Sequence, residues 1–271
     1  MARDGGKRGT AVITGASGGI GEELAKLFAA DGYDLVLVAR SRDGLDRVGG
    51  ALAAEHRVAF HAVPADLTDP SAPEAVFRAV RDAGVETSAL VNNAGFGLHG
   101  AFAAVDGKPA NDLQRELDMI QLNVTALTHL TKLFLPDMVA RRRGRVLNVA
   151  STAAFQPGPF MAVYYATKAY VLSFSEAVAM ELRGTGVTVT ALCPGPTHTG
   201  FQKHADAEGT RLFHSPLVMN APDVARIGYR GMQRGKRVVV TGALNRLLAV
   251  GTRLVPHSVS AKIVERGHEP A

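Results

Sequence analysis

The chain has 271 residues, of which 46% are hydrophobic and 20% are charged, and its formal net charge is +5. This length suits one large α/β domain, and two independent domains are not required. The single cysteine, Cys193, excludes an internal disulfide and a zinc site built from cysteines, which fits a reducing compartment. No run of about eighteen apolar residues occurs, and no apolar signal segment precedes the first strand. We therefore expect a soluble, cytoplasmic protein.

The positive charge is concentrated near the ends of the chain. Residues 236–271 hold six basic and two acidic groups, while the middle is close to neutral, so a nucleic-acid-binding face on the main body is not expected. A solvated turn between a helix and a strand explains the internal basic cluster at residues 141–145. The histidines His198, His204 and His214 share no helical spacing with acidic residues, and we predict no metal site.

The first predicted strand, residues 10–13, leads directly into the sequence TGASGGIG at residues 14–21 and then into a helical pattern. A glycine-rich turn between a strand and a helix lets the backbone approach a pyrophosphate, whose charge the helix N-terminus receives. A purely structural turn has a similar composition. The position at the first strand-to-helix junction favours dinucleotide binding.

The second predicted strand, residues 34–39, ends where a ribose-selecting residue is expected. No carboxylate occupies that point, because Ala39 is followed by Arg40, Ser41 and Arg42. Guanidinium groups suit a 2′-phosphate, with the serine hydroxyl as a further donor. This strand end therefore predicts NADP(H) as the cofactor.

Two further strands are predicted at residues 58–63 and 89–91, with a helix at 70–83 between them. Asp66 follows the first of these strands, where it either accepts a hydrogen bond from an adenine amino group or serves as a plain turn residue. The sequence NNAG at 92–95 follows the second, where small residues let the chain run beside a cofactor and the amides brace the sheet. Strands that alternate with helices at this spacing predict a parallel, doubly wound sheet.

Residues 111–139 repeat apolar side chains at three- and four-residue steps, which predicts a helix. Asn123 falls beside this apolar stripe, and a buried asparagine needs hydrogen-bond partners. Either it satisfies the backbone at a kink, or it holds a water that relays a proton. The sequence leaves both readings open.

The residues with the clearest chemistry lie between Val149 and Leu172. Ser151 ends the apolar run 146–150, and ligands bind at strand ends in parallel sheets. If Tyr164 and Lys168 open a helix, they lie on one face, and the ammonium is expected to lower the pKa of the phenol from about 10. Tyr164 is thus a candidate general acid or base. Taken alone, the pair is common on solvent-exposed helices.

The C-terminal third is predicted to begin with a strand at 187–192, followed by the loop CPGPTHT at 193–199 and a substrate-covering segment through about Asn220. A helix at 221–234, a strand at 237–241 and a basic amphipathic tail at 243–267 are predicted to follow. We expect the tail to pack on a partner subunit or on the protein's own lid. A cationic amphipathic helix can also rest on a membrane surface.

Taken together, these motifs resemble the short-chain dehydrogenase/reductase family in order and spacing. The motifs are TGASGGIG at 14–21, NNAG at 92–95, Asn123, Ser151, YYATK at 164–168 and PGPTHT at 194–199. The resemblance covers about residues 9–241. It implies a Rossmann-type α/β fold of about seven parallel strands with helices on both faces, in a single domain spanning 1–271. It also implies an oxidoreductase that assembles as a homodimer or homotetramer.

The resemblance implies that Asn123, Ser151, Tyr164 and Lys168 form a catalytic tetrad. Ser151 would bind the substrate carbonyl, Tyr164 would give or take the proton, Lys168 would bind the nicotinamide ribose, and Asn123 would hold a relay water. The implied cofactor contacts are Gly15, Ser17, Gly19, Ile20, Asp66, Leu67, Asn93, Ala94, Gly95, Tyr164, Lys168, Pro194, Gly195 and Thr197. Some NADP-preferring members carry a basic residue where this chain has Gly18, so binding of the phosphate would depend on Arg40 and Arg42.

The favoured function is an NADPH-dependent reductase of a ketone or aldehyde, reversible as an alcohol dehydrogenase. An alternative is a nucleotide-sensing binding module with little turnover, but simple binding does not require Ser151, Tyr164 and Lys168 together. An epimerase or dehydratase with tightly held NAD would need more C-terminal machinery than the tail provides.

Overall fold

A seven-stranded sheet lies at the centre of the protein. The computed structural model describes residues 8–104, 109–201, 217–252 and 255–268. The sheet has the order β3-β2-β1-β4-β5-β6-β9, and every neighbouring pair is parallel. Its strands are β1 (Thr10–Thr14), β2 (Asp34–Ala39), β3 (Phe60–Pro64), β4 (Thr87–Asn92), β5 (Gly144–Val149), β6 (Val187–Cys193) and β9 (Val238–Val240).

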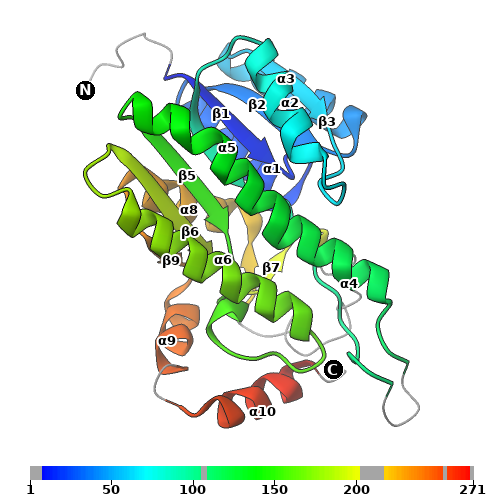
Figure 1. Cartoon of the computed structure of the whole chain (residues 1–271). Coiled ribbons are helices and arrows are strands. Elements are labelled where there is room, and N and C mark those ends of the chain that lie inside the picture. The colour runs from blue at the N-terminus through cyan, green and yellow to red at the C-terminus, as the bar shows by residue number, and fades with distance from the viewer. Residues whose placement is uncertain (1–7, 105–108, 202–216, 253–254, 269–271) are drawn as a thin grey trace.

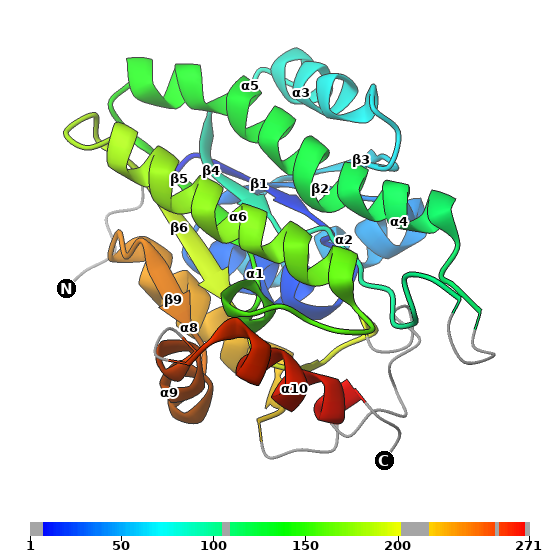
Figure 2. The same ribbon diagram turned by 60° about the horizontal axis from the view of Figure 1, so that its bottom comes forward.

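Helices cover both faces of this sheet (Figures 1 and 2). One face carries α1 (Gly19–Ala30), α2 (Arg42–His56) and α8 (Ala221–Gln233). The other carries α3 (Ala72–Asp82), α4 (Leu113–Ile120), α5 (Leu127–Ala140) and α6 (Ala162–Glu181). The chain ends in α9 (Ala243–Gly251) and α10 (His257–His268).

Because both faces are covered, the central strands are buried along their whole length, and apolar residues occupy their middle positions. All five residues of β1 and all six of β4 are buried. Parallel strands buried on both faces have such nearly continuous apolar sequences. The doubly wound α/β fold predicted from the sequence is confirmed.

The strand order places one crevice at the carboxyl end of the sheet. From β1 the chain continues outward through β2 and β3, then returns to β4 on the other side of β1. A doubly wound sheet binds its ligand where the strand order reverses in this way. The glycine-rich turn follows β1 and Asn93 follows β4, so the two motifs meet at this point.

The predicted 111–139 helix is interrupted by a turn of different geometry. Residues Gln121–Ala126 form a π-helical turn that joins α4 to α5. Such turns are frequent at functional sites, and this one contains Asn123. The predicted apolar stripe is buried only beyond this turn, because Leu127 and Leu130 are buried whereas Leu113 and Leu117 of α4 are exposed.

The predicted amphipathic tail forms two helices. Pro256 lies between α9 and α10, and its ring nitrogen has no hydrogen to donate to a continuous helix. In Figure 1 both helices lie at the end of the sheet to which the arrow of β5 points. Asn245 and Ala249 of α9, and Ser260 and Val264 of α10, are buried. The tail therefore packs on the body of the protein.

Three short elements were not predicted. A 3-10 turn (η2, Thr152–Phe155) follows β5, and β7 (Thr197–His198) pairs with β8 (Met219–Asn220) in a separate two-stranded sheet. Most of the predicted substrate-covering segment, residues 202–216, lies outside the described residues. No helix within the described ranges is long and apolar enough to cross a membrane.

Candidate active site

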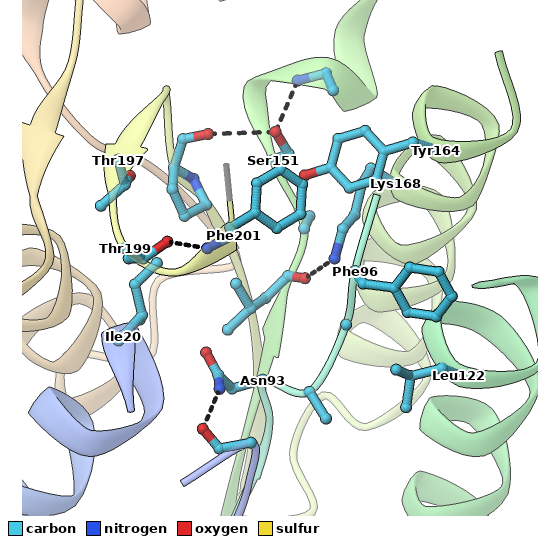
Figure 3. A pocket seen from close by; sticks show the side chains of 18 of the residues that line it. Ile20, Asn93, Phe96, Leu122, Ser151, Tyr164, Lys168, Thr197, Thr199 and Phe201 are labelled. Carbon is cyan, nitrogen blue, oxygen red and sulfur yellow. Dashed lines mark hydrogen bonds between the residues drawn. The ribbon is translucent and has the colours of Figure 1, made fainter. Parts of the chain in front are cut away.

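A cavity of about 810 Å³ occupies the crevice at the carboxyl end of the sheet. It extends from the glycine-rich turn to Ser151 and Tyr164, and Figure 3 shows these two side chains opposite Ile20 and Asn93. The predicted site residues that line it are Gly15, Ser17, Gly19, Ile20, Arg40, Asp66, Leu67, Asn93, Ala94, Gly95, Ser151, Tyr164, Lys168, Pro194, Gly195 and Thr197. Asn123 and Arg42 do not line it.

The glycine-rich turn is fixed to the end of β4 by side-chain hydrogen bonds. Gly15 and Gly19 have φ angles of +65° and +57°, which glycine adopts without steric cost. Asn93 Nδ2 donates to the carbonyl oxygens of Thr14 and Gly15 at 3.0 and 3.2 Å. The Thr14 hydroxyl accepts from the backbone N–H groups of Asn93 and Ala94, both at 3.0 Å. The first amide that the sequence predicted to brace the sheet does so too, because Asn92 donates to Asn148 at 2.9 Å.

The close approach of this turn to α1 predicts a steric effect at Gly21. A Cβ atom added there would overlap the Gly15 carbonyl oxygen and the Asn93 amide. Alanine improves helix propensity by about 1 kcal/mol, but the backbone carbonyl cannot rotate away. We expect Gly21→Ala to lower the free energy of unfolding by about 1–2 kcal/mol net and to weaken dinucleotide binding.

Gly18→Ala is the matched control for this prediction. Gly18 has an extended backbone, and nothing lies within 4 Å of its added Cβ. Its stability should stay within about 0.5 kcal/mol of the wild type. Thermal melting and nucleotide titration of both variants test the prediction, and equal behaviour of the two would contradict it.

The end of β2 brings one arginine to the cavity. Arg40 lines the cavity, is exposed, and forms no ion pair with any residue that the structure describes. Arg42 is also exposed, but its Nε atom lies 2.8 Å from Asp46 Oδ2, one turn further along α2. Arg47, which the sequence analysis did not single out, donates to the Ser17 carbonyl oxygen at 3.1 Å and to Glu22 Oε2 at 3.0 Å, and it does not line the cavity.

Ser151 and Tyr164 meet where β5 ends and α6 begins. Ser151 caps η2, and its Oγ atom accepts from Ala153 N at 3.1 Å and donates to the Pro194 carbonyl oxygen at 3.4 Å. The Tyr164 ring lies 5.3 Å from that of Phe201, measured between centroids (Figure 3). Burial raises the pKa of Tyr164 to about 12, while a hydrogen bond with Ser151 acts in the opposite direction.

The predicted lowering of the Tyr164 pKa by Lys168 is wrong for this structure. Lys168 Nζ lies 5.8 Å from the centre of the Tyr164 ring and donates to the Val149 carbonyl oxygen at 2.9 Å. Burial lowers the pKa of Lys168 itself to about 8. The two side chains do share one face of α6, as predicted, but loss of solvent is the largest influence on both pKa values.

Asn123 satisfies the backbone of a neighbouring loop. Its Nδ2 atom donates to the Phe96 carbonyl oxygen at 2.9 Å and to Thr167 Oγ1 at 3.1 Å, while Oδ1 accepts from Phe96 N at 3.2 Å. The Thr167 hydroxyl donates to the Tyr164 carbonyl oxygen at 2.7 Å. Asn123 thus links the π-helical turn to the helix that carries Tyr164. Thr167 was not singled out, although it lies inside the YYATK motif.

Asp66 has local partners that fit the turn reading of the sequence. Its Oδ1 atom accepts from the backbone N–H and the hydroxyl of Thr68 at 3.0 and 2.8 Å. The residue also lines the cavity together with Leu67. The geometry therefore leaves Asp66 beside the cavity, with part of its carboxylate occupied by the turn.

The tail supplies one wall of the cavity, which the sequence analysis did not predict. Asn245, Leu248, Ala249 and Thr252 of α9 line it. Their spacing of three, one and three residues places them on one helical face. This spacing could have indicated a common face. Because Asn245 and Thr252 are polar, a search for apolar periodicity did not find it.

Comparison with known proteins agrees with this geometry. The family model described as short chain dehydrogenase matches residues 9–209. Serine 3-dehydrogenase of Agrobacterium fabrum is 36% identical over 193 residues, which are 71% of this chain and 74% of that relative. Other curated relatives are longer, and the match spans as little as 58% of their length.

Solved structures extend the similarity over most of the chain. A short-chain dehydrogenase from Sphingobium yanoikuyae in complex with NADPH is 34% identical, with a TM-score of 0.79, and the match covers 91% of this chain and 94% of that one. The bulky-bulky ketone specific alcohol dehydrogenase of Comamonas testosteroni is 30% identical, with a TM-score of 0.76 and coverage of 92% and 93%. This chain belongs to the short-chain dehydrogenase/reductase family of oxidoreductases.

Proposed function

We propose that this protein is an NADP(H)-dependent reductase of a ketone or aldehyde, acting in reverse as a secondary-alcohol dehydrogenase. The observation that carries the proposal is the hydrogen-bonded pair Ser151 and Tyr164 in the same cavity as the glycine-rich turn and Arg40. The similarity to a structure solved with NADPH supports the choice of cofactor.

The residues present fit a dinucleotide. Gly15, Gly18 and Gly19 line the cavity without side chains, so a pyrophosphate can approach the backbone at the start of α1. Arg40 supplies a cation beside the cavity for the 2′-phosphate. A bound nicotinamide would supply or accept the hydride.

The chain's own residues have separate roles in this proposal. The Ser151 hydroxyl orients the substrate oxygen, and the Tyr164 phenol gives a proton to that oxygen in reduction or removes it in oxidation. Lys168 provides an ammonium on the same face of α6. Asn123 is a positioning residue that fixes the loop at Phe96. That it also holds a water that relays the proton stays a hypothesis.

The substrate end of the cavity favours an apolar carbonyl compound. Phe96, Leu122, Met161, Phe201 and Leu248 line the cavity, and Met161 and Phe201 pack beside Tyr164. Such a lining excludes water and gains free energy by covering apolar substituents. The similarity to a dehydrogenase specific for bulky ketones agrees with this substrate class.

A panel of carbonyl compounds assayed with NADPH tests the function. We expect turnover of ketones with apolar substituents, and little turnover of small hydrophilic ones. The alternative, a binding module, predicts that NADPH binds with ordinary affinity while no compound in the panel is reduced. Nucleotide titration alongside the assay separates the two outcomes.

The raised pKa of Tyr164 predicts a pH-dependent rate for oxidation but not for reduction. Burial raises this pKa to about 12, so the phenol is protonated at neutral pH and ready to donate in reduction. Oxidation needs the phenolate, whose fraction grows about tenfold per pH unit below the pKa. We expect kcat/KM for oxidation to rise between about pH 7 and pH 9, with no matching rise for reduction. A flat oxidation profile would contradict this assignment.

We also propose that the chain forms one domain and a homo-oligomer in which the tail supports the cavity. Asn245 Nδ2 donates to the Leu217 carbonyl oxygen at 3.2 Å, and Val264 is buried beside Met161 and Tyr165. Truncation after Gly242 removes both contacts. We expect it to lower the melting temperature by about 5 °C or more, or to lower the oligomer mass.

Neighbouring residues of α10 provide a control for the tail. Val264 is 8% exposed, whereas Ile263 is 65% exposed. Val264→Ala should cost about 1–2 kcal/mol, and Ile263→Ala should cost less than about 0.5 kcal/mol. If truncation changes neither mass nor melting, and the full chain sediments with anionic liposomes, the membrane reading of the tail is preferred.

A further inference from the structure

Two amide side chains in the wall of the reaction cavity have no role in the chemistry described above. Gln156 ends the turn η2, and Asn245 lies on α9. Both residues line the cavity, and η2 and α9 are adjacent in the fold. The two amides therefore belong to one part of the wall, beside Ser151, which caps η2.

The Asn245 amide is held in one orientation. The residue is 5% exposed, and its Nδ2 atom donates to the Leu217 carbonyl oxygen at 3.2 Å. A carbonyl oxygen accepts only from the NH2 side of an amide, so Oδ1 is the atom that remains. Oδ1 has no hydrogen bond with a residue that the structure describes. Because a buried acceptor without a partner costs free energy, Asn245 favours a ligand that donates a hydrogen bond.

The loop after β6 places this acceptor near Ser151. A Cβ atom added at Gly195 would overlap the Asn245 amide, so these two residues are in contact. The preceding residue is Pro194, whose carbonyl oxygen accepts from Ser151 Oγ at 3.4 Å and from Thr152 N at 2.8 Å. Asn245 thus lies on the far side of the loop segment that Ser151 contacts, where a second group of a substrate held at Ser151 can meet it.

Gln156 supplies the complementary group. It is half-buried, and its side chain has no hydrogen bond within the described ranges. A primary amide contains both a donor and an acceptor, so Gln156 can donate where Asn245 accepts. A hydroxyl group matches this pair, because one hydroxyl donates a hydrogen bond and also accepts one.

The charges of the wall disfavour an ionic group at this point. None of the described residues that line the cavity from η2 and α9 is charged. The charged residues that line it in the described ranges come from other elements, and they are Arg40, Asp66, Arg115, Asp118 and Lys168. A carboxylate or ammonium bound between η2 and α9 would lose its hydration without gaining a partner of opposite charge there.

We propose that the substrate is an apolar ketone or aldehyde that also carries a hydroxyl group, and that this hydroxyl binds between η2 and α9. It donates to Asn245 Oδ1 and accepts from the Gln156 amide, while the reacting carbonyl lies at Ser151 and Tyr164. This inference rests on the proposed reductase function and makes Gln156 and Asn245 specificity-determining residues. A site built to bind a hydroxyl rejects an analogue that lacks it, because the polar groups of the site are then left unpaired.

Kinetics of the full-length protein with paired ketones and NADPH test the proposal. The probes are acetophenones with a hydroxymethyl or hydroxyethyl group at the meta or para position, so that the distance between carbonyl and hydroxyl varies. Each is compared with the compound in which a methyl group replaces the hydroxyl. We expect at least one hydroxylated compound to exceed its methyl counterpart in kcat/KM by about tenfold or more, the ratio expected when a buried amide would otherwise lack its partner.

Leucine substitutions identify the residues that recognise the hydroxyl. Gln156→Leu and Asn245→Leu should each lower the preference for the hydroxylated compound by about fivefold or more. A purely structural defect would lower kcat/KM for both members of a pair and leave their ratio unchanged. Arg246→Leu is the matched control, because Arg246 follows Asn245 on α9, is exposed and does not line the cavity. Its ratio should equal that of the wild type.

Melting curves establish that each variant is folded. If Asn245→Leu is unstable because it loses the Leu217 contact, Gln156→Leu decides the question, since the Gln156 side chain makes no hydrogen bond with the described protein. An unchanged preference in folded Gln156→Leu would overturn the proposal.

Three further outcomes would also overturn it. Equal kcat/KM within every pair would show that no hydroxyl is recognised, although the reductase function would stand. Weaker NADPH binding by folded Asn245→Leu, with the preference unchanged, would assign the Asn245 acceptor to the cofactor. Binding of NADPH without reduction of any ketone would overturn the proposed function together with this inference.

Discussion

Tyr164→Phe is expected to lower kcat by about 10²-fold or more while nucleotide affinity is retained. The phenylalanine keeps the ring that packs near Phe201 and removes only the hydroxyl that hydrogen-bonds with Ser151. The reaction then lacks its positioned proton donor. Steady-state kinetics with a reducible ketone, together with a nucleotide titration, separate the loss of chemistry from a loss of binding.

Tyr165→Phe is the matched control, since it removes the same atom from the next residue. The Tyr165 ring packs against Ala153, Met161 and Val264. Burial raises the pKa of Tyr165 as well, with the neighbouring phenol adding to the effect. We expect its variant to keep activity within a few-fold of wild type. Equal losses for the two variants would show that the proton is not carried by Tyr164 specifically.

The second large effect is expected in cofactor choice. Arg40 lies beside the cavity with no ion pair among the described residues, and Ala39 offers no carboxylate to repel a phosphate. A charge-assisted hydrogen bond contributes about 1.5–3 kcal/mol, which corresponds to about 10- to 150-fold. We therefore expect kcat/KM to favour NADPH over NADH by at least about tenfold, and Ala39→Asp with Arg40→Leu to reverse the preference.

The structure sharpens the expected contribution of the second arginine. The sequence suggested that Arg40 and Arg42 share the phosphate, but Arg42 is bonded to Asp46 and does not line the cavity. Arg42→Leu should thus change the ratio of the two kcat/KM values much less than Arg40→Leu does. Both ratios are measured on one carbonyl substrate in low-salt buffer. A wild-type ratio near one would show that the phosphate is not recognised at this strand end.

Features that depend on neighbouring residues were predictable from the sequence. The apolar run of β1, the glycine-rich turn and the start of α1 follow one another directly, and each has its own residue preferences. The shared face of Tyr164 and Lys168 follows from the helical repeat alone. Even the pairing of Arg42 with Asp46 has a local signal, because the two residues are one helical turn apart.

Features that depend on burial or on distant segments required the tertiary structure. The Lys168 ammonium was expected to lower the pKa of Tyr164, but the surrounding protein removes solvent from both groups, and this desolvation is the largest influence on each pKa. Asn123 is 27 residues from Phe96 in the sequence, so only the fold brings its amide to that backbone.

The sequence by itself determined the parallel sheet, the position of the dinucleotide turn and the helix face that carries the candidate acid. Only the tertiary structure decided that α9 forms one wall of the cavity, and that Arg40 lines this cavity whereas Arg42 does not. The physical reason is that sequence periodicity indicates which face of a helix or strand is apolar. Which residues cover that face depends on how elements distant in the sequence pack together.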